Sequence, residues 1–321
     1  MINKVAVIGA GTMGHGFANN FASHGIKVNL YEAFENVRET VTDRIRGELE
    51  VMVSEGYFEE DVIGRTLANI ELFDDLEEAV KDVDLVLEAT PERLDLKKEL
   101  FAKLDQFCRP DTIFASNTSS LKLFDMTADL PEKRKAKAMV AHGYNPAHLI
   151  PIIELSFFGN MSKEDFEEVK TFFERCEKVP VKVLKDVTGM VANRLLHAQA
   201  RECFYLIDQG IAEPEDVDKA LMFGPCFRNA TTGMMECADM GGLDIWCAAE
   251  ENFFPDLSNS DKPSRSMKEL VESGNYGYKT GKGFYEYPEE TREQVLNDFN
   301  RRLIMQLKTS RNYKKPGEEQ G

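Results

Sequence analysis

The sequence of 321 residues contains no apolar run long enough to cross a bilayer, although 42% of its residues are hydrophobic. It also opens without the basic region and apolar stretch of a secretory signal, because Asn3 and Lys4 lead directly into a strand-like segment. These two absences lead us to expect a cytoplasmic protein with no membrane partner.

Basic residues are fewer than acidic ones. The 39 lysines and arginines are outnumbered by 56 aspartates and glutamates, which gives a formal net charge of −17. Such a surface repels polyanions, so we expect neither a nucleic acid nor an anionic membrane as a partner.

Clustered metal ligands are missing as well. The six cysteines are scattered without CxxC spacing, and the five histidines do not group with them or with one another. We therefore expect no metal site, and we interpret the cysteines mainly as inert core residues.

The most informative feature that is present lies at the start of the chain. Residues 3–8 form a short β-branched run, which ends in the sequence Gly9-Ala10-Gly11-Thr12-Met13-Gly14 and leads into an amphipathic helix. A second apolar run at 26–31 closes on Glu32. Strand, glycine turn, helix, strand and terminal carboxylate follow in the order of a dinucleotide-binding fold.

Each glycine of such a turn has its own physical role. Gly9 permits the tight turn, Gly11 lets the backbone approach a pyrophosphate, and Gly14 lets the helix pack against the strand. Glu32 can accept hydrogen bonds from a ribose but would repel a 2′-phosphate, so we expect NAD rather than NADP. The alternative is an ordinary βαβ unit that binds nothing. The predicted cofactor contacts in this segment are Gly9, Gly11, Thr12, Met13, Gly14 and Glu32.

The first half of the chain alternates strand-like runs with helical stretches, which predicts a doubly wound α/β fold of the Rossmann type. Residues 33–69 are too long for one crossover helix and predict a helical hairpin that turns near Gly56. The further predicted strands are 84–88, 112–116, 138–142, 150–155 and 180–184.

The pattern becomes almost purely helical from Thr188, which we predict as an N-cap. Gly210 is a candidate C-cap, and Pro214 suits the first turn of the next helix. We therefore predict two domains, an NAD-binding domain at 1–186 and a smaller all-helical domain at 187–321. The last dozen residues, rich in Lys, Pro, Glu and Gly, are expected to form a frayed tail.

Polar residues lie at or just after the ends of two of the predicted strands, at the sheet edge where α/β folds bind ligands. They are Asn117-Thr118-Ser119-Ser120 and His142, and Glu154 lies on the next strand. A histidine can accept the proton of a hydroxyl near neutral pH, and a carboxylate can fix its tautomer. Asn193 begins the first helix of the second domain. Taken singly, each of these residues also has a purely structural interpretation.

Six stretches, in order, resemble the 3-hydroxyacyl-CoA dehydrogenase family along nearly the whole chain. They are the glycine turn, Leu87–Glu92, Phe114–Leu121, His142 to Pro146 with Glu154, Gly189–Arg194 and Gly277–Tyr285.

This resemblance implies an NAD-dependent, reversible oxidation of a short-chain 3-hydroxyacyl-CoA, such as 3-hydroxybutyryl-CoA, to the 3-ketoacyl-CoA. It implies that His142 is the general base, that Glu154 orients it, and that Ser119 and Asn193 bind the substrate oxygen. It also implies a homodimer formed through the C-terminal domain. Glu202 is a further family position, which we interpret as part of the helix structure or of a domain contact. The further implied cofactor contacts are Glu92, Lys97, Asn117, Ser119 and Asn145.

The chain departs from the family at several places. Gly143-Tyr144 replaces two aromatics after the base, and Gly233–Glu236 replaces the usual Gly-Pro-Phe-Glu. The phrase Leu149–Glu154 resembles relatives that act on small free hydroxy acids, the L-gulonate dehydrogenases and lambda-crystallins. A free 3-hydroxy acid, gulonate- or carnitine-like, is thus the alternative substrate, and a non-catalytic NAD-binding structural protein is a remote one. The hairpin that often binds coenzyme A has no lysine, and its basic residues are Arg38, Arg44, Arg46 and Arg65.

Overall fold

In a computed structural model of the protein, residues 1–313 are described. The chain divides into two compact units, Met1–Asn193 and Arg194–Gly321. Most of the tail expected at the C-terminus falls at 314–321, outside the described residues.

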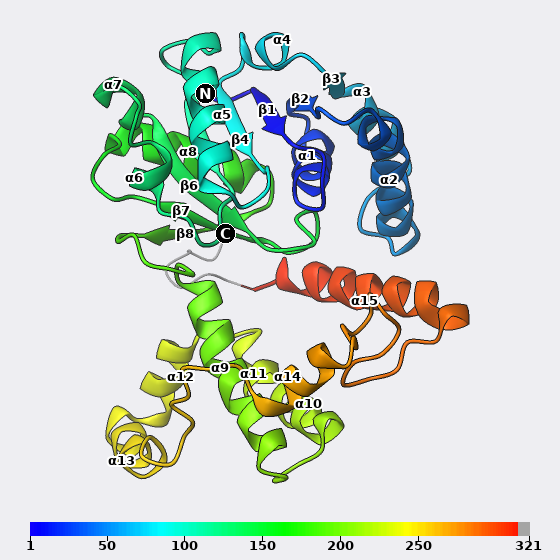
Figure 1. The fold of residues 1–321 in the computed structure, drawn as a ribbon, viewed down its shortest axis with the longest axis vertical. Coiled ribbons are helices and arrows are strands. Elements are labelled where there is room, and N and C mark those ends of the chain that lie inside the picture. The colour runs from blue at the N-terminus through cyan, green and yellow to red at the C-terminus, as the bar shows by residue number, and fades with distance from the viewer. Residues whose placement is uncertain (314–321) are drawn as a thin grey trace. The chain divides into compact units, whose positions relative to one another are not determined.

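The N-terminal unit is built on one sheet with the strand order β3-β2-β1-β4-β5-β6-β7-β8 (Figure 1). Strands β1 to β6 pair in parallel, β7 is antiparallel to β6, and β8 is parallel to β7. Because β2 and β4 lie on opposite sides of β1, the strand order reverses there, and α/β sheets bind ligands at such points. The doubly wound α/β fold is confirmed. The strands are β1 (Lys4–Ile8), β2 (Lys27–Tyr31), β3 (Ile70–Phe73), β4 (Leu85–Glu88), β5 (Ile113–Ser116), β6 (Ala138–Gly143), β7 (Ile152–Ser156) and β8 (Val179–Val183).

Helices cover both faces of this sheet, and each face has its own buried apolar cluster. Alternate side chains of a strand point to opposite faces, so Val5 and Val7 belong to one cluster while Ala6 and Ile8 belong to the other. Both faces of the sheet are therefore covered, which explains why the strands are continuous apolar runs. The helices of this unit are α1 (Gly14–Ser23), α2 (Glu35–Ser54), α3 (Asp61–Ala68), α4 (Leu76–Val80), α5 (Leu94–Phe107), α6 (Leu123–Met126), α7 (Glu132–Lys135) and α8 (Lys163–Arg175).

The helical hairpin predicted at 33–69 is confirmed, since α2 and α3 flank a turn in which Gly56 has a φ of 64°. Strand β3, which follows the hairpin, was not predicted. It has only four residues, and the two central ones, Glu71 and Leu72, are exposed. Glu71 interrupts its apolar residues, so no continuous apolar run marks this short edge strand in the sequence.

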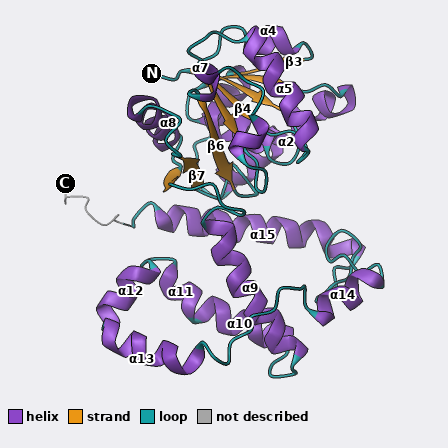
Figure 2. Ribbon diagram, turned by 60° about the vertical axis from the view of Figure 1, so that its left-hand side comes forward, coloured by secondary structure: helices purple, strands orange, loops and turns teal. Residues whose placement is uncertain are grey.

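The C-terminal unit contains helices and loops, with no strand among residues 194–313 (Figure 2). Pro214 is confirmed in the first turn of α10, and Gly210, with a φ of 66°, follows the end of α9. Glu202 accepts a hydrogen bond from the backbone of Ser258 at 2.8 Å, which is a structural role. No helix among the described residues is long and apolar enough to cross a membrane. The helices are α9 (Ala192–Asp208), α10 (Pro214–Phe223), α11 (Pro225–Asn229), α12 (Met234–Gly241), α13 (Leu243–Phe253), α14 (Arg265–Glu272) and α15 (Glu289–Ser310).

The predicted N-cap at Thr188 is wrong, because α9 begins four residues later, at Ala192. Gly189 and Met190 have positive φ angles of 77° and 48°, which a right-handed helix does not allow. The carboxylate of Glu154 instead accepts the backbone N–H groups of Val191 and Ala192, both at 2.8 Å. A side chain from β7, distant in sequence, therefore caps this helix.

Candidate active site

The turn after β1 is bound to the carboxylate at the end of β2. Glu32 accepts the backbone N–H of Ala10 at 2.8 Å through one oxygen and that of Phe34 at 3.0 Å through the other. Gly9 has a φ of 97°, and a Cβ there would lie 2.9 Å from the carbonyl oxygen of Ala89. The sequence-predicted turn and acid therefore lie together at the point where the strand order reverses.

The other two glycines of the turn face different surroundings. A Cβ on Gly14 would lie 1.7 Å from the carbonyl oxygen of Gly9, so the backbones of the helix and the turn leave no room for a side chain there. A Cβ on Gly11 would meet nothing within 4 Å, and Gly11 and Thr12 are exposed while Met13 is half-buried. An open backbone at a helix N-terminus beside a carboxylate fits the phosphates and ribose of a dinucleotide.

A buried ion pair connects the end of β4 to α5. The ammonium of Lys97 lies 2.6 Å from one oxygen of Glu88 and 2.7 Å from the other, and both side chains are almost fully buried. Thr90 and Ser116 also donate to Glu88, so the buried charges are fully paired. Lys97 was predicted as a cofactor contact, and its ammonium lies 3.5 Å from the carboxylate of Glu92. The pairing of Lys97 with Glu88 was not predicted.

Glu92 fixes the polar turn that follows β5. One of its oxygens accepts from the Thr118 hydroxyl at 2.7 Å and from the backbone of Ser119 at 3.0 Å and Ser120 at 2.8 Å. Burial alone would raise the pKa of Glu92, but these hydrogen bonds and the charge of Lys97 outweigh it and lower the pKa to about 2. Two predicted site residues, Glu92 and Ser119, are therefore in contact.

Asn117 joins the ends of three strands. Its backbone N–H donates to the carbonyl of Glu88 at 2.8 Å, and its side-chain oxygen accepts from the backbone of Gly143 at 2.9 Å. Asn145, another predicted cofactor contact, is exposed two residues beyond the end of β6. The predicted polar groups thus gather at the carboxyl ends of β4, β5 and β6.

The predicted base and its carboxylate face each other across two strands. His142 on β6 is directly opposite Glu154 on β7, and the His142 Nδ1 lies 2.8 Å from a Glu154 oxygen. Both side chains are buried. Burial would raise the pKa of Glu154, but hydrogen bonds from His142, Ala192 and Val191 outweigh it and lower that pKa below its usual value.

This contact fixes the proton on the imidazole. A carboxylate can only accept a hydrogen bond, so Nδ1 carries the hydrogen and Nε2 of the neutral ring keeps its lone pair. Nε2 makes no hydrogen bond to any other group within residues 1–313. The pair is therefore arranged to take up a proton at Nε2, and the resulting positive charge would lie against Glu154.

Asn193, the last predicted catalytic residue, lies next to Tyr144. The hydroxyl of Tyr144 donates to the Asn193 Oδ1 at 2.6 Å, and its ring centre lies 5.5 Å from that of His142. In the sequence, Tyr144 stands out only as a departure from the family pattern. The signal that could have found it is a hydroxyl-bearing side chain two residues after the base.

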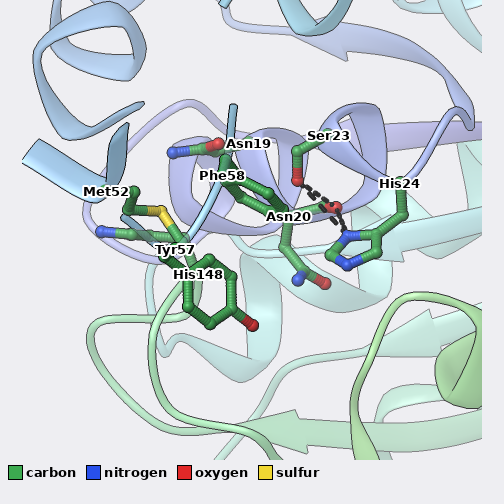
Figure 3. Close-up of a pocket in the computed structure, with 8 residues that line it drawn as sticks. All are labelled: Asn19, Asn20, Ser23, His24, Met52, Tyr57, Phe58 and His148. Carbon is green, nitrogen blue, oxygen red and sulfur yellow. Dashed lines mark hydrogen bonds between the residues drawn. The ribbon is translucent and has the colours of Figure 1, made fainter. Parts of the chain in front are cut away.

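A separate small pocket, drawn in Figure 3, lies against α1 and is lined by none of the predicted site residues. Its volume is about 10 Å³, which is room for about one water molecule. Burial lowers the pKa of His148, one of its lining residues, to about 4. This pocket is too small for a substrate. The lining residues are Asn19, Asn20, Ser23, His24, Met52, Tyr57, Phe58 and His148.

Fold and site together define an NAD-dependent oxidoreductase that acts on CH–OH groups, and two family models agree. The model for the NAD-binding domain of 3-hydroxyacyl-CoA dehydrogenase matches residues 4–187, and the model for the C-terminal domain of that family matches residues 189–287. The chain belongs to the 3-hydroxyacyl-CoA dehydrogenase family, and its cofactor is NAD.

Similar proteins have several different substrates in their names. A 5-formyl-3-hydroxy-2-methylpyridine 4-carboxylate 5-dehydrogenase of Mesorhizobium japonicum is 32% identical over 95% of this chain and 97% of its own. A probable 3-hydroxybutyryl-CoA dehydrogenase of Bacillus subtilis is 32% identical over 90% of this chain and 99% of its own. An L-carnitine dehydrogenase of Oceanobacillus iheyensis is 33% identical over 72% of this chain and 74% of its own.

A solved structure closely matches the whole chain. It is that of a 5-formyl-3-hydroxy-2-methylpyridine 4-carboxylic acid 5-dehydrogenase, an NAD⁺-dependent dismutase. The TM-score is 0.89 at 29% identity, and the match covers 98% of this chain and 100% of that one.

The contrast between Gly11 and Gly14 can be tested with matched alanine variants. We expect Gly14→Ala to destabilise the fold by about 2 kcal/mol or more, because its methyl group would overlap the Gly9 carbonyl. Gly11→Ala should unfold at the wild-type urea concentration but bind NADH more weakly, because its methyl group would enter the space left for the pyrophosphate. Urea unfolding and NADH fluorescence titration measure the two effects. Wild-type NADH affinity in Gly11→Ala would show that the cofactor lies elsewhere.

Proposed function

We propose that this protein oxidises a hydroxyl-bearing carbon of a small acid to a carbonyl, with His142 as the general base. The observation that carries the proposal is the buried 2.8 Å contact between His142 and Glu154. The Nε2 atom of His142 takes the proton of the substrate hydroxyl, and Glu154 stabilises the imidazolium that forms. NAD, when bound, supplies the acceptor for the hydride that leaves the carbon.

Ser119 and Asn193 are proposed to bind the substrate oxygen. Support for this comes from their placement: Glu92 holds the turn that carries Ser119, and Tyr144, beside His142, holds Asn193. Donors fixed in advance are the most effective at polarising a carbonyl, because they need no reorganisation during the reaction. The cofactor contacts proposed here, which follow the family pattern, are Gly9, Gly11, Thr12, Met13, Gly14, Glu32, Glu92, Lys97, Asn117, Ser119 and Asn145.

For the substrate we propose a free hydroxy acid. In the hairpin that the family resemblance assigns to coenzyme A, Arg44 donates to the backbone oxygen of Ala10 at 2.8 Å. Arg38 donates to the backbone oxygen of Glu32 at 2.7 Å, and Arg65 pairs with Asp61 at 2.8 Å. Three of the four arginines of the hairpin are thus occupied by groups of the chain, and the hairpin has no lysine to bind a phosphate. Two relatives are also named for free acids, the pyridine carboxylate and carnitine.

A short-chain 3-hydroxyacyl-CoA, which the sequence placed first, is the second candidate. The relative from Bacillus subtilis is named for 3-hydroxybutyryl-CoA, and it matches nearly its whole length. The chemistry at His142 is the same for both substrates, so they differ only in what binds the rest of the molecule.

The reaction and its substrate can be tested in one assay of NADH formation. Purified protein with NAD is offered 3-hydroxybutyrate, L-gulonate, L-carnitine and 3-hydroxybutyryl-CoA, and we expect turnover of a free acid. His142→Gln should lower kcat by about 100-fold or more, because a general base contributes about 10²–10⁴-fold. Its NADH affinity should not change, since His142 is not among the proposed cofactor contacts.

The other outcomes of this assay have distinct meanings. Turnover of the thioester alone would contradict the free-acid proposal, while the proposed role of His142 as general base would still stand. Full turnover by His142→Gln would remove His142 from the mechanism. NADH binding without turnover of any of the four compounds would contradict both proposed substrates.

We also propose that the protein is a homodimer formed through its C-terminal domain, for which the sequence suggested the range 187–321. Only four apolar side chains are buried among residues 194–313, whereas many large ones are between 62% and 80% exposed. Apolar surface of this extent is usually covered by a partner. The buried residues are Val217, Cys237, Ile304 and Leu307, and the exposed ones include Phe223, Phe227, Met235, Met240, Leu243, Ile245, Phe253 and Phe254.

Sedimentation equilibrium at micromolar concentration tests the homodimer. We expect twice the mass of the chain, because a second copy offers a matching apolar surface under two-fold symmetry. A stable monomer would contradict the proposal.

A cytoplasmic location is proposed as well. All six cysteines are free thiols, which is the usual state in a reducing compartment. Recovery of the protein from a secreted or periplasmic fraction would contradict this location.

A further inference from the structure

The side chain of Tyr144 is a feature of the site that the family resemblance does not explain. The family commonly has two aromatics after the base, and this chain has Gly143 and Tyr144. The first of these two positions has no room for an aromatic side chain, because a Cβ on Gly143 would lie 2.6 Å from the ring of Phe17. Only the second position retains a ring, and that ring carries a hydroxyl.

This hydroxyl is placed between the base and the start of α9. The ring of Tyr144 is tilted by 56° to that of His142, with 5.5 Å between the centres. Its oxygen lies 2.6 Å from the Oδ1 of Asn193. One side chain therefore contacts both the proposed base and a proposed ligand of the substrate oxygen.

The direction of this hydrogen bond determines which end of the Asn193 amide remains available. The Oδ1 atom can only accept, so the Tyr144 hydroxyl is the donor. Burial and the nearby charge of Glu154 raise the pKa of Tyr144 above its usual value, so the hydroxyl keeps its proton at neutral pH. With Oδ1 occupied, the NH₂ group of Asn193 is left to donate to another oxygen.

The backbone leading to Asn193 is held independently. Glu154 accepts the N–H groups of Val191 and Ala192, each at 2.8 Å. The carboxylate that orients His142 therefore also fixes the chain just before Asn193, while Tyr144 fixes the Asn193 side chain.

We propose that Tyr144 is a positioning residue, whose hydroxyl holds the carboxamide of Asn193 with its NH₂ group directed to the substrate oxygen. This inference rests on the proposed function, because it assumes that Asn193 binds that oxygen. Tyr144 itself transfers no proton. Its effect on catalysis passes through Asn193.

A double-mutant cycle tests this dependence directly. The variants are Tyr144→Phe, which keeps the ring, Asn193→Ala, and the two combined. They are assayed with whichever of the four compounds above the wild type turns over fastest. We expect Tyr144→Phe to lower kcat by about three- to tenfold without changing NADH affinity, which is the usual effect of one lost hydrogen bond. The double variant should be no slower than Asn193→Ala alone.

A matched control is Tyr57→Phe. Tyr57 is likewise a tyrosine of the N-terminal unit, although it is buried where Tyr144 is half-buried, and its hydroxyl donates to Glu177 at 2.7 Å. It lies in the small pocket against α1 and outside the proposed site. We expect wild-type kcat in this variant, so that loss of a tyrosine hydroxyl alone cannot account for the effect at Tyr144.

A second measurement does not depend on turnover. In protein labelled with ¹⁵N at asparagine, the side-chain signals of Asn193 are those missing from Asn193→Ala. We expect Tyr144→Phe to shift these signals and Tyr57→Phe to leave them unchanged. Unshifted signals in Tyr144→Phe would overturn the inference, whatever the substrate.

The kinetic outcomes separate this inference from the proposed function. If Tyr144→Phe slows the Asn193→Ala protein as much as it slows the wild type, Tyr144 does not act through Asn193 and the inference fails alone. If Asn193→Ala has wild-type kcat, the proposed role of Asn193 fails and the inference fails with it.

Discussion

A buried carboxylate loses the water that stabilises its charge, and Glu154 has no exposed surface at all. Three donors replace that water: the His142 ring on one oxygen and two backbone N–H groups at the start of α9 on the other. The sheet, the proposed base His142 and Ala192, the first residue of α9, are thereby tied to one side chain. Removing that carboxylate would leave all three donors without a partner, and the His142 ring would lose the hydrogen bond that sets its orientation.

Carboxylates hold the other functional turns of the N-terminal unit in the same way. Glu32 binds the glycine turn through the N–H of Ala10, and Glu92 binds the serine turn after β5. Glu88 neutralises Lys97 beneath them. Loops at a sheet edge have unpaired backbone donors, and a carboxylate from a neighbouring strand or turn satisfies them at a fixed geometry. A rigid polar rim suits a reaction that requires donors fixed before the substrate arrives.

Much of this arrangement could be predicted from the sequence because its signals are local. The apolar runs, the glycine turn and the carboxylate after β2 are all readable within the first 32 residues. The pairing of His142 with Glu154 was also within reach, because two adjacent antiparallel strands with a short connection place such residues opposite each other. The hairpin at 33–69 was found through its helical spacing and its length.

The remainder depends on contacts between residues far apart in the chain. Thr188 has the composition of an N-cap, but the cap of α9 comes from Glu154, 38 positions before Ala192. Strand β3 is defined by its partner β2, because Glu71 interrupts its short apolar sequence. The bond between Tyr144 and Asn193 spans 49 positions and joins two residues whose side chains each suit several roles. No local sequence pattern predicts such long-range pairings.

The most direct test of the account is the kcat of Glu154→Gln. The amide oxygen of glutamine can still accept the N–H groups of Val191 and Ala192, so the fold and the start of α9 should be retained. Its NH₂ group, however, can only donate to the Nδ1 of His142, which moves the ring proton to Nε2 and removes the base. We predict wild-type NADH affinity and a kcat lower by about 100-fold or more. A kcat close to that of the wild type would contradict the central role given to the Glu154 carboxylate.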